Sequence, residues 1–270
     1  MSATPAKPVL LTGGSGALGR MLVRALAGDG WRLVVTDIRP FEGTLPDNAR
    51  FVQADLQDGV DVLRLAEGCG AIIHLGGISV ERPFEEVIGP NIRGLYHIYE
   101  AARREKARVI FASSNHAFGF YERTATIDAD APFMPDGYYG LSKAYGELMG
   151  RLYWHKHGVE NVNIRIGSAT VEPVNARMLA SWMSYPDLAR LVKASVTAPG
   201  VGHIAVWGAS ANRRMTWWRQ DDRGVVEWTP QDSADPFTGR LQGMTSNDPV
   251  EERFMGGAYC SIDYTRQDGA

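Results

Sequence analysis

Cysteine, net charge and long apolar runs are all scarce in this chain of 270 residues. The two cysteines, Cys69 and Cys260, lie 191 positions apart and outside any CxxC or Cys/His spacing. This excludes a disulfide scaffold and a cysteine-based zinc site, so we expect no metal, and it suits a reducing compartment. The 28 basic and 31 acidic side chains nearly cancel. The chain therefore generates no overall field that would attract nucleic acid or an anionic membrane.

Targeting and membrane-spanning segments are missing as well. Residues 1–8 contain a lysine but no apolar stretch of the kind found in signal peptides. The first uncharged run, residues 8–19, contains four glycines and falls short of the ~20 residues that a membrane helix needs. We therefore expect a cytoplasmic protein with neither a membrane nor a nucleic-acid partner.

Short apolar runs alternate with amphipathic stretches in the first half of the chain, which predicts an α/β protein with a doubly wound parallel sheet. The pattern loosens after residue 167, where prolines recur and five of the seven tryptophans lie. We interpret residues 1–270 as a single domain, with 7–167 as its core and 168–270 as a small, irregular cap packed against the sheet. The expected strands are 9–11, 33–35, 51–52, 71–73, 109–111 and 162–166, and the expected helices include 87–105 and 139–157.

The most informative glycines lie in residues 12–19, TGGSGALG, directly after the first expected strand. Gly13, Gly16 and Gly19 follow one another at intervals of three, which allows a tight turn, close approach of the backbone to a pyrophosphate, and close packing of the next helix. An ordinary turn between a strand and a helix also collects glycine. Asp37, however, ends the next strand 18 positions after Gly19, where a carboxylate accepts hydrogen bonds from the hydroxyls of an adenosine ribose. Together these features predict a Rossmann-type core that binds a dinucleotide.

Asp37 also indicates which dinucleotide binds, because a carboxylate there repels the 2′-phosphate of NADP and so favours NAD. Arg39, two positions on, would accept that phosphate and leaves residual use of NADP open. Asp55, after the third strand, either brackets the adenine or simply caps a helix. The residues that we expect to contact NAD from this half of the chain are Gly13, Gly16, Ala17, Leu18, Gly19, Asp37, Ile38, Asp55, Leu56, Leu75, Gly76 and Gly77.

A tyrosine and a lysine four residues apart, Tyr139 and Lys143, lie on one face of a predicted helix. A phenol with a pKa of ~10 is a poor base near neutrality, and a neighbouring ammonium favours the phenolate. Such a pair alone is common by chance and is usually a surface contact. Here Ser114, with Ser113 as the adjacent alternative, ends the preceding strand, and the combination is specific. We therefore expect Tyr139 to act as a base whose pKa Lys143 lowers.

These motifs occur in the order found in the extended short-chain dehydrogenase/reductase family, which the chain resembles. The resemblance implies that Ser114 polarises the reacting oxygen, that Tyr139 is the acid/base, and that Lys143 also holds the nicotinamide ribose. It implies that Asn91 supports a proton relay, with a side chain that merely satisfies the core as the alternative. The matching segments are TGGSGALG, Asp37, HLGG at 74–77, NIRGLYHIYEAA from Asn91, SSN at 113–115 and YGLSK at 139–143.

Five longer stretches resemble the NAD-dependent uronate dehydrogenases: residues 74–85, 111–121, 135–147, 165–179 and 206–212. The resemblance implies that Arg177 pairs with the carboxylate of the sugar, which is chemically reasonable because a planar guanidinium binds a carboxylate with two hydrogen bonds. On the residues alone, Arg177 would be a solvated surface arginine and His116 a loop histidine bonded to the backbone. The resemblance implies that a hexuronate is held by Ser79, Ser114, Asn115, His116, Tyr139, Ser168 and Arg177.

The implied reaction is the oxidation of D-glucuronate or D-galacturonate at C1 to an aldarolactone, with NAD as acceptor. A nucleotide-sugar epimerase or dehydratase is the alternative enzyme, although the SSN segment lacks the acidic pair of a dehydratase. A non-catalytic sensor of NAD(P) is a further alternative, although such proteins typically lose the tyrosine and lysine. The resemblance also suggests a homo-oligomer, with a hexamer as one form. We interpret the acidic run 81–86 as a solvated helix start and the cluster at 213–219 as cap packing or a subunit contact.

Overall fold

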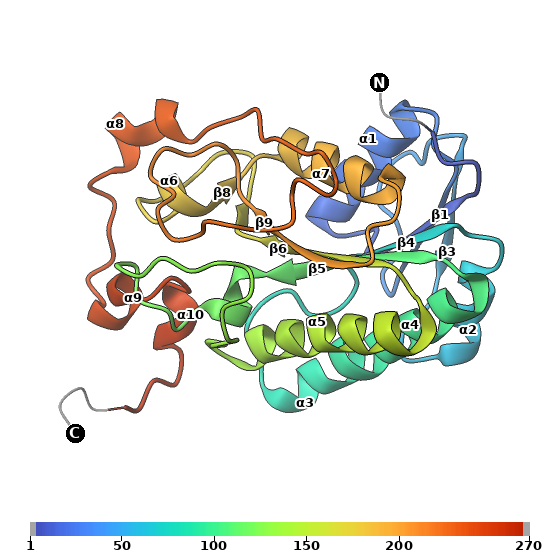
Figure 1. Cartoon of the computed structure of the whole chain (residues 1–270), viewed down its shortest axis with the longest axis horizontal. Helices are drawn as coiled ribbons and strands as arrows, with labels where there is room; N and C mark the ends of the chain where they lie inside the picture. The colour runs from blue at the N-terminus through green and yellow to red at the C-terminus, as the bar shows by residue number, and fades with distance from the viewer. Residues whose placement is uncertain (1–3, 267–270) are drawn as a thin grey trace.

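Seven parallel strands form the central sheet of this protein, whose computed structural model describes residues 4–266 (Figure 1). Residues 1–3 of the N-terminal stretch and 267–270 of the expected cap lie outside the described residues. The strand order is β3-β2-β1-β4-β5-β6-β9, and every neighbouring pair is parallel. The strands are β1 (Val9–Thr12), β2 (Leu33–Asp37), β3 (Ala49–Gln53), β4 (Ala71–His74), β5 (Arg108–Ser114), β6 (Asn161–Ile166) and β9 (His203–Gly208).

Helices cover both faces of the sheet, which is why the inner strands are apolar on both sides. Helices α1 and α7 pack together on one face, and α2, α4 and α5 lie on the other (Figure 1). The predicted doubly wound α/β fold is confirmed. The longer helices are α1 (Ala17–Gly28), α2 (Gly59–Ala66), α4 (Gly94–Glu105), α5 (Tyr138–His157) and α7 (Tyr185–Thr197). None of the helices within residues 4–266 is long and apolar enough to cross a membrane.

The expected helix at 87–105 is interrupted. The chain forms a short α3 (Phe84–Val87), then a π-helical turn η1 (Ile88–Arg93), and only then α4. Pro90 lies inside the turn and has no backbone N–H, so a regular α-helical ladder is not maintained there. Single π-helical turns of this kind are frequent at functional sites, and this one contains the buried Asn91.

The C-terminal part contributes more regular structure than its proline content indicates. Strand β9 pairs with β6 and extends the sheet, and α7 covers its face. Pro186 does not break a helix but lies in the first turn of α7, where Ser184 caps the helix by accepting from the amide of Asp187. We propose that the chain is one domain, because residues from beyond 167 complete the sheet and one of its two helical layers.

The remaining C-terminal segments are short. The tryptophans expected in the cap are buried, and Trp207 of β9 stacks on Trp218 with ring centroids 4.9 Å apart. This confirms cap packing for the aromatic part of the 213–219 cluster, whereas Arg213 and Arg214 remain exposed. The short elements are η2 (Asn115–Phe118), β7 (Ser168–Ala169), α6 (Met178–Ser181), β8 (Trp182–Met183), η3 (Asp235–Phe237), α8 (Thr238–Leu241), α9 (Pro249–Arg253) and α10 (Ala258–Ser261).

A buried ion pair fixes α5 against the sheet. Glu147 of α5 and Arg165 of β6 are each almost fully buried, and Arg165 Nη2 lies 2.7 Å from Glu147 Oε2. The guanidinium also lies over the rings of Phe118 and Trp207. Both charges are therefore paired, as buried charges must be.

We expect Glu147→Gln to lower the free energy of unfolding by about 3–5 kcal/mol, because it leaves the buried Arg165 charge without its partner. Urea denaturation followed by circular dichroism measures this. The matched control is Glu172→Gln, which removes an exposed ion pair with Arg240 and should change the stability by less than about 1 kcal/mol. Equal losses in the two variants would contradict the prediction.

Candidate active site

The carboxyl ends of all seven sheet strands meet at one edge, because the strands are parallel. The glycine loop follows β1, residues 75–77 follow β4, and Ser114 is the last residue of β5. Strands β2 and β3 lie on one side of β1, and β4 and the later strands of the sheet lie on its other side. The order of the strands in the sheet therefore reverses at β1. Such a switch point is where open α/β sheets bind their ligands.

The glycine loop has the geometry that a pyrophosphate requires. Gly13 has a φ of +73°, and a Cβ there would lie 2.8 Å from the backbone of Leu75 and Gly76. Helix α1 begins after Gly16, which provides no side-chain cap, and its first turn contains no acidic residue. The amides of this helix end are therefore available to an anion, which the helix dipole also favours.

Asp37 lies at the end of β2 and holds the loop in place. Its carboxylate accepts from the backbone N–H of Ser15 and of Arg39, at 3.0 Å each. The Arg39 side chain is mostly exposed, and its Nε lies 3.9 Å from Asp37 Oδ1. The loop, the uncapped helix end and this carboxylate fit the pyrophosphate and adenosine ribose of NAD.

The other residues expected to contact the cofactor surround the same edge of the sheet. Ala17, Leu18 and Gly19 form the first turn of α1, and Ile38 is exposed directly after β2. Asp55 accepts from the amide of Gln57 in a local turn and does not cap a helix. The cap of α2 is Asp58, so the capping alternative for Asp55 is wrong. Leu56, Leu75, Gly76 and Gly77 line the turns after β3 and β4.

Tyr139 and Lys143 lie in the first turns of α5 and are both buried. Lys143 Nζ donates to the carbonyl of Ala112 at 2.7 Å and lies 5.4 Å from the centre of the Tyr139 ring. Burial raises the pKa of Tyr139 above its ordinary value, and a hydrogen bond with Ser114 opposes that increase. Burial also lowers the pKa of Lys143 to about 8.

The expected lowering of the Tyr139 pKa by Lys143 is therefore not found in the protein alone. Burial penalises the charged form of each group. For the phenol, this effect on the pKa is larger than the opposing effect of the hydrogen bond with Ser114. Ser113 is a structural residue, because its hydroxyl donates to Glu147 at 2.5 Å. Ser114, the residue hydrogen-bonded to Tyr139, is thus the serine directed at the site.

The acidic run at 81–86 is not simply a solvated helix start. Glu81 accepts from the backbone N–H of Tyr138 and of Tyr139, at 2.8 Å each, and so caps the first turn of α5. A capping residue 57 positions away from the helix it caps leaves no local pattern in the sequence. This contact fixes the first turn of α5, which contains Tyr139, relative to the loop after β4.

Asn91 positions that same loop. Its amide accepts from the N–H of Ile78 at 2.7 Å, donates to the Ile78 carbonyl at 3.0 Å, and donates to the Ser142 hydroxyl at 2.9 Å. Two of these hydrogen bonds join Asn91 to the loop after β4, and the third joins it to Ser142, which directly precedes Lys143 on α5. Ser79 follows in the loop and is exposed.

On the opposite side of the site, Arg177 projects from the segment before α6. Its Nε donates to the carbonyl of Met255 at 2.7 Å and its Nη1 to the hydroxyl of Ser168 at 3.2 Å. The Asn115 amide lies with its oxygen 2.8 Å from Arg177 Nη2 and its nitrogen 3.1 Å from the carbonyl of Ile166. The structure thus brings Arg177, Ser168 and Asn115 together, and Arg177 is not a solvated surface residue.

Arg177 carries a positive charge that forms no ion pair within the described part of the chain. Among residues 4–266, no acidic side chain lies within ion-pair distance of its guanidinium. Burial, together with the nearby Arg123, lowers the pKa of Arg177 to about 10. Asp136 and Glu251 act on Arg177 from beyond ion-pair distance and oppose that decrease. A partly buried cation without an ion-pair partner favours an anionic ligand.

His116 is held by a residue that the sequence motifs did not identify. Its Nδ1 lies 2.6 Å from Oδ2 of the fully buried Asp136, and it is not a histidine bonded only to the backbone. Its ring stacks on Tyr259 at 4.0 Å and meets the ring of Tyr139 edge to face at 5.8 Å. Asp136 and Tyr259 belong to the site, although neither has a local sequence signal.

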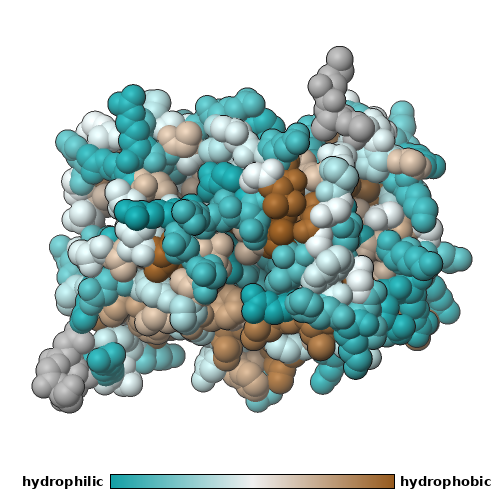
Figure 2. All heavy atoms as spheres, viewed as in Figure 1, coloured by the Kyte–Doolittle hydropathy of each residue, from teal (hydrophilic) through white to brown (hydrophobic). Residues whose placement is uncertain are grey.

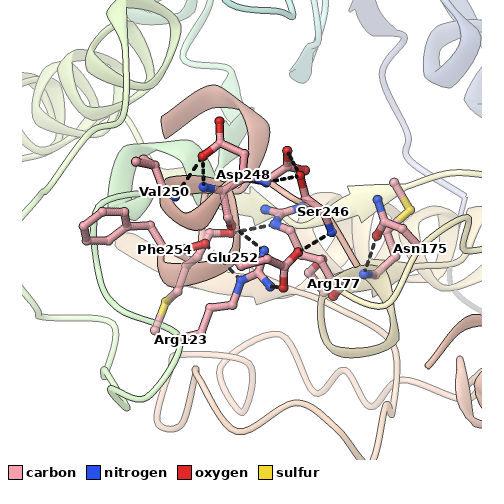
Figure 3. Close-up of polar contacts among 12 residues, drawn as sticks. Arg123, Asn175, Arg177, Ser246, Asp248, Val250, Glu252 and Phe254 are labelled. Atoms are coloured by element: carbon pink, nitrogen blue, oxygen red, sulfur yellow. Dashed lines mark hydrogen bonds and ion pairs between the residues drawn. The ribbon is translucent and has the colours of Figure 1, made fainter. Parts of the chain in front are cut away.

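The C-terminal segment that contains Tyr259 is tied down by Arg123, as Figure 3 shows. Arg123 donates to the carbonyls of Phe254 and Glu251 and pairs with the Glu252 carboxylate at 2.7 Å. Gly257, with a φ of +64°, lies so close to Arg177 that a Cβ would come within 2.8 Å of its Cδ. This glycine lets the segment pass over the site without displacing Arg177.

Comparison with known proteins agrees with this geometry. The family model described as the NAD dependent epimerase/dehydratase family matches residues 9–214. The chain is 45% identical to a uronate dehydrogenase of Pseudomonas syringae pv. tomato over 95% of this chain and 94% of that protein. A uronate dehydrogenase of Pseudomonas putida is 44% identical over 96% and 97%.

Among solved structures, a mutant uronate dehydrogenase from Agrobacterium tumefaciens in complex with NAD is 42% identical. It superposes with a TM-score of 0.90 over 97% of this chain and 99% of that one. This chain belongs to the NAD-dependent epimerase/dehydratase family, the extended short-chain dehydrogenases/reductases, and its cofactor is NAD.

Proposed function

We propose that this protein is an NAD-dependent uronate dehydrogenase that oxidises D-glucuronate or D-galacturonate at C1 to the aldarolactone. The observation that carries the proposal is the Arg177 guanidinium, which has no ion-pair partner among residues 4–266 and contacts Asn115, the residue next to Ser114. A cyclic hexuronate has its anomeric hydroxyl on C1 and its carboxylate on C5, on either side of the ring oxygen, so one sugar can address both groups. Full-length relatives named uronate dehydrogenases support the assignment.

In the proposed reaction, Ser114 and Tyr139 hold the anomeric hydroxyl, and Tyr139 removes its proton as a base. Arg177, with Ser168 and Asn115, holds the carboxylate, and His116 is oriented by Asp136 beside the sugar. Bound NAD would supply the acceptor for the hydride of C1, and a cationic nicotinamide held near Tyr139 would favour the phenolate form of this side chain. Lys143 would hold the nicotinamide ribose from the same turn of α5. Oxidation of a cyclic hemiacetal carbon gives a lactone directly.

We expect Tyr139→Phe to lower kcat by about 10²–10⁴-fold, because it removes the group that takes the proton. NAD binding, measured as a shift in melting temperature, should persist. The matched control is Tyr138→Phe, since Tyr138 is half exposed and directly precedes the candidate base. Full turnover by the Tyr139 variant would contradict the assigned base, and a protein inactive on uronates but still binding NAD would favour the sensor alternative.

We expect Arg177→Gln to lower kcat/KM for D-galacturonate by about tenfold to a hundredfold, the effect of losing a charge-assisted hydrogen bond. Activity on D-galactose, which lacks the carboxylate, should fall much less. NADH absorbance measures both. If the variant loses activity equally on the acidic and the neutral sugar, the guanidinium does not bind the carboxylate.

We infer that the protein forms a homo-oligomer through α5. Leu141, Leu148 and Leu152 are each about half exposed and share one face of this helix. Figure 2 shows apolar residues gathered in the lower middle of the view, where α5 lies in Figure 1 with α3 below it. Exposed apolar surface of this kind is typical of contacts between subunits.

We expect the double variant Leu148→Glu, Leu152→Glu to reduce the molar mass in solution to that of one chain, because it buries charge in the inferred contact. Light scattering after size exclusion measures the mass. Val171→Glu, at an exposed position in a loop after β7, is the control and should leave the assembly unchanged. An unchanged mass for the double variant would exclude this face.

A further inference from the structure

A cavity of about 460 Å³ adjoins the Arg177 end of the candidate site. Its volume is within the range of small-molecule sites. Ser114, His116 and Tyr139 do not line it, so it lies beyond the end of the site where the reaction would occur. The lining residues are Arg123, Ala176, Arg177, Ala180, Arg213, Arg214, Thr216 and Trp217.

Two of the four arginines are already balanced by carboxylates. Arg123 pairs with Glu252 at 2.7 Å, and Arg213 pairs with Asp235 at 3.2 Å. Arg214 donates to the Gln242 side chain at 3.3 Å, and no carboxylate within residues 4–266 pairs with it. The cavity therefore has two unbalanced positive charges, at Arg177 and at Arg214.

A single hexuronate would neutralise only one of these charges. Its carboxylate at Arg177 leaves Arg214 on the rim of the cavity without an anion. In a hexopyranose ring, C1 and C4 lie at opposite ends, and C6 is attached next to C4. A sugar with C1 at Tyr139 and its carboxylate at Arg177 therefore directs its 4-oxygen toward the cavity.

We propose that this protein also oxidises the reducing end of short oligouronides, with the second uronate ring in the arginine-lined cavity and its carboxylate at Arg214. The proposal rests on the proposed function. The hydride leaves C1 of the reducing ring for NAD, and the proton of the C1 hydroxyl goes to Tyr139. The products are a C1 lactone and NADH, and the glycosidic bond stays intact.

The purified protein is assayed for NADH formation with D-galacturonate, with digalacturonate, and with digalacturonate methyl-esterified on the non-reducing ring. We expect kcat/KM for digalacturonate to be at least equal to that for the monomer. For the ester we expect kcat/KM to be about threefold to fivefold lower than for digalacturonate, because the ester cannot form the partly exposed ion pair with Arg214. Mass spectrometry should find the product with both rings.

Arg214→Gln should raise KM for digalacturonate by about threefold to fivefold and leave the monomer and the ester nearly unchanged. Arg219→Gln, an exposed arginine of the same segment outside the cavity, is the matched control and should alter none of the three. If the protein oxidises galacturonate but not digalacturonate, this inference is wrong and the proposed function stands. The same holds if Arg214→Gln affects digalacturonate and its methyl ester equally. If neither uronate is oxidised, the proposed function itself fails.

Discussion

Glu147 and Arg165 form a buried ion pair that joins α5 to β6, and the candidate catalytic groups depend on the position that this pair gives to α5. Tyr139 and Lys143 lie two turns and one turn before Glu147 on that helix. The same carboxylate accepts the hydroxyl of Ser113, so Ser114 is the serine left to meet Tyr139. Removing one partner of such a pair leaves a buried charge, which makes the arrangement strongly coupled to folding.

Burial governs the electrostatics at both ends of the site. It raises the pKa of Tyr139 and lowers the pKa of Lys143, because each loses solvation in its charged form. Arg177 is a partly buried cation without an ion-pair partner among residues 4–266, and its charge is available to a ligand. The Arg177 charge is thus the feature of the site that favours an anionic ligand.

The C-terminal segment makes the site specific beyond the common dinucleotide-binding core. Arg123 fastens residues 251–254, and the chain then returns over the site to place Tyr259 on His116. Backbone hydrogen bonds from Met255 and Gly256 to Tyr121 and Gly119 hold it there. The segment also supplies the Met255 carbonyl that fixes Arg177, so the carboxylate end and the aromatic wall of the site are built together.

The sequence by itself determined the alternating strands and helices, the glycine loop with Asp37, and the tyrosine and lysine pair, because each is a local pattern with a fixed spacing. Only the tertiary structure decided that Glu81 caps α5, that Asn91 holds the loop after β4, and that Asp136 and Tyr259 fix His116. The π-helical turn around Pro90 and the added strand β9 were likewise missed. Most of these features depend on contacts between residues far apart in the chain, and the π-helical turn depends on the backbone N–H that Pro90 lacks. Neither kind of cause produces a periodic pattern in the sequence.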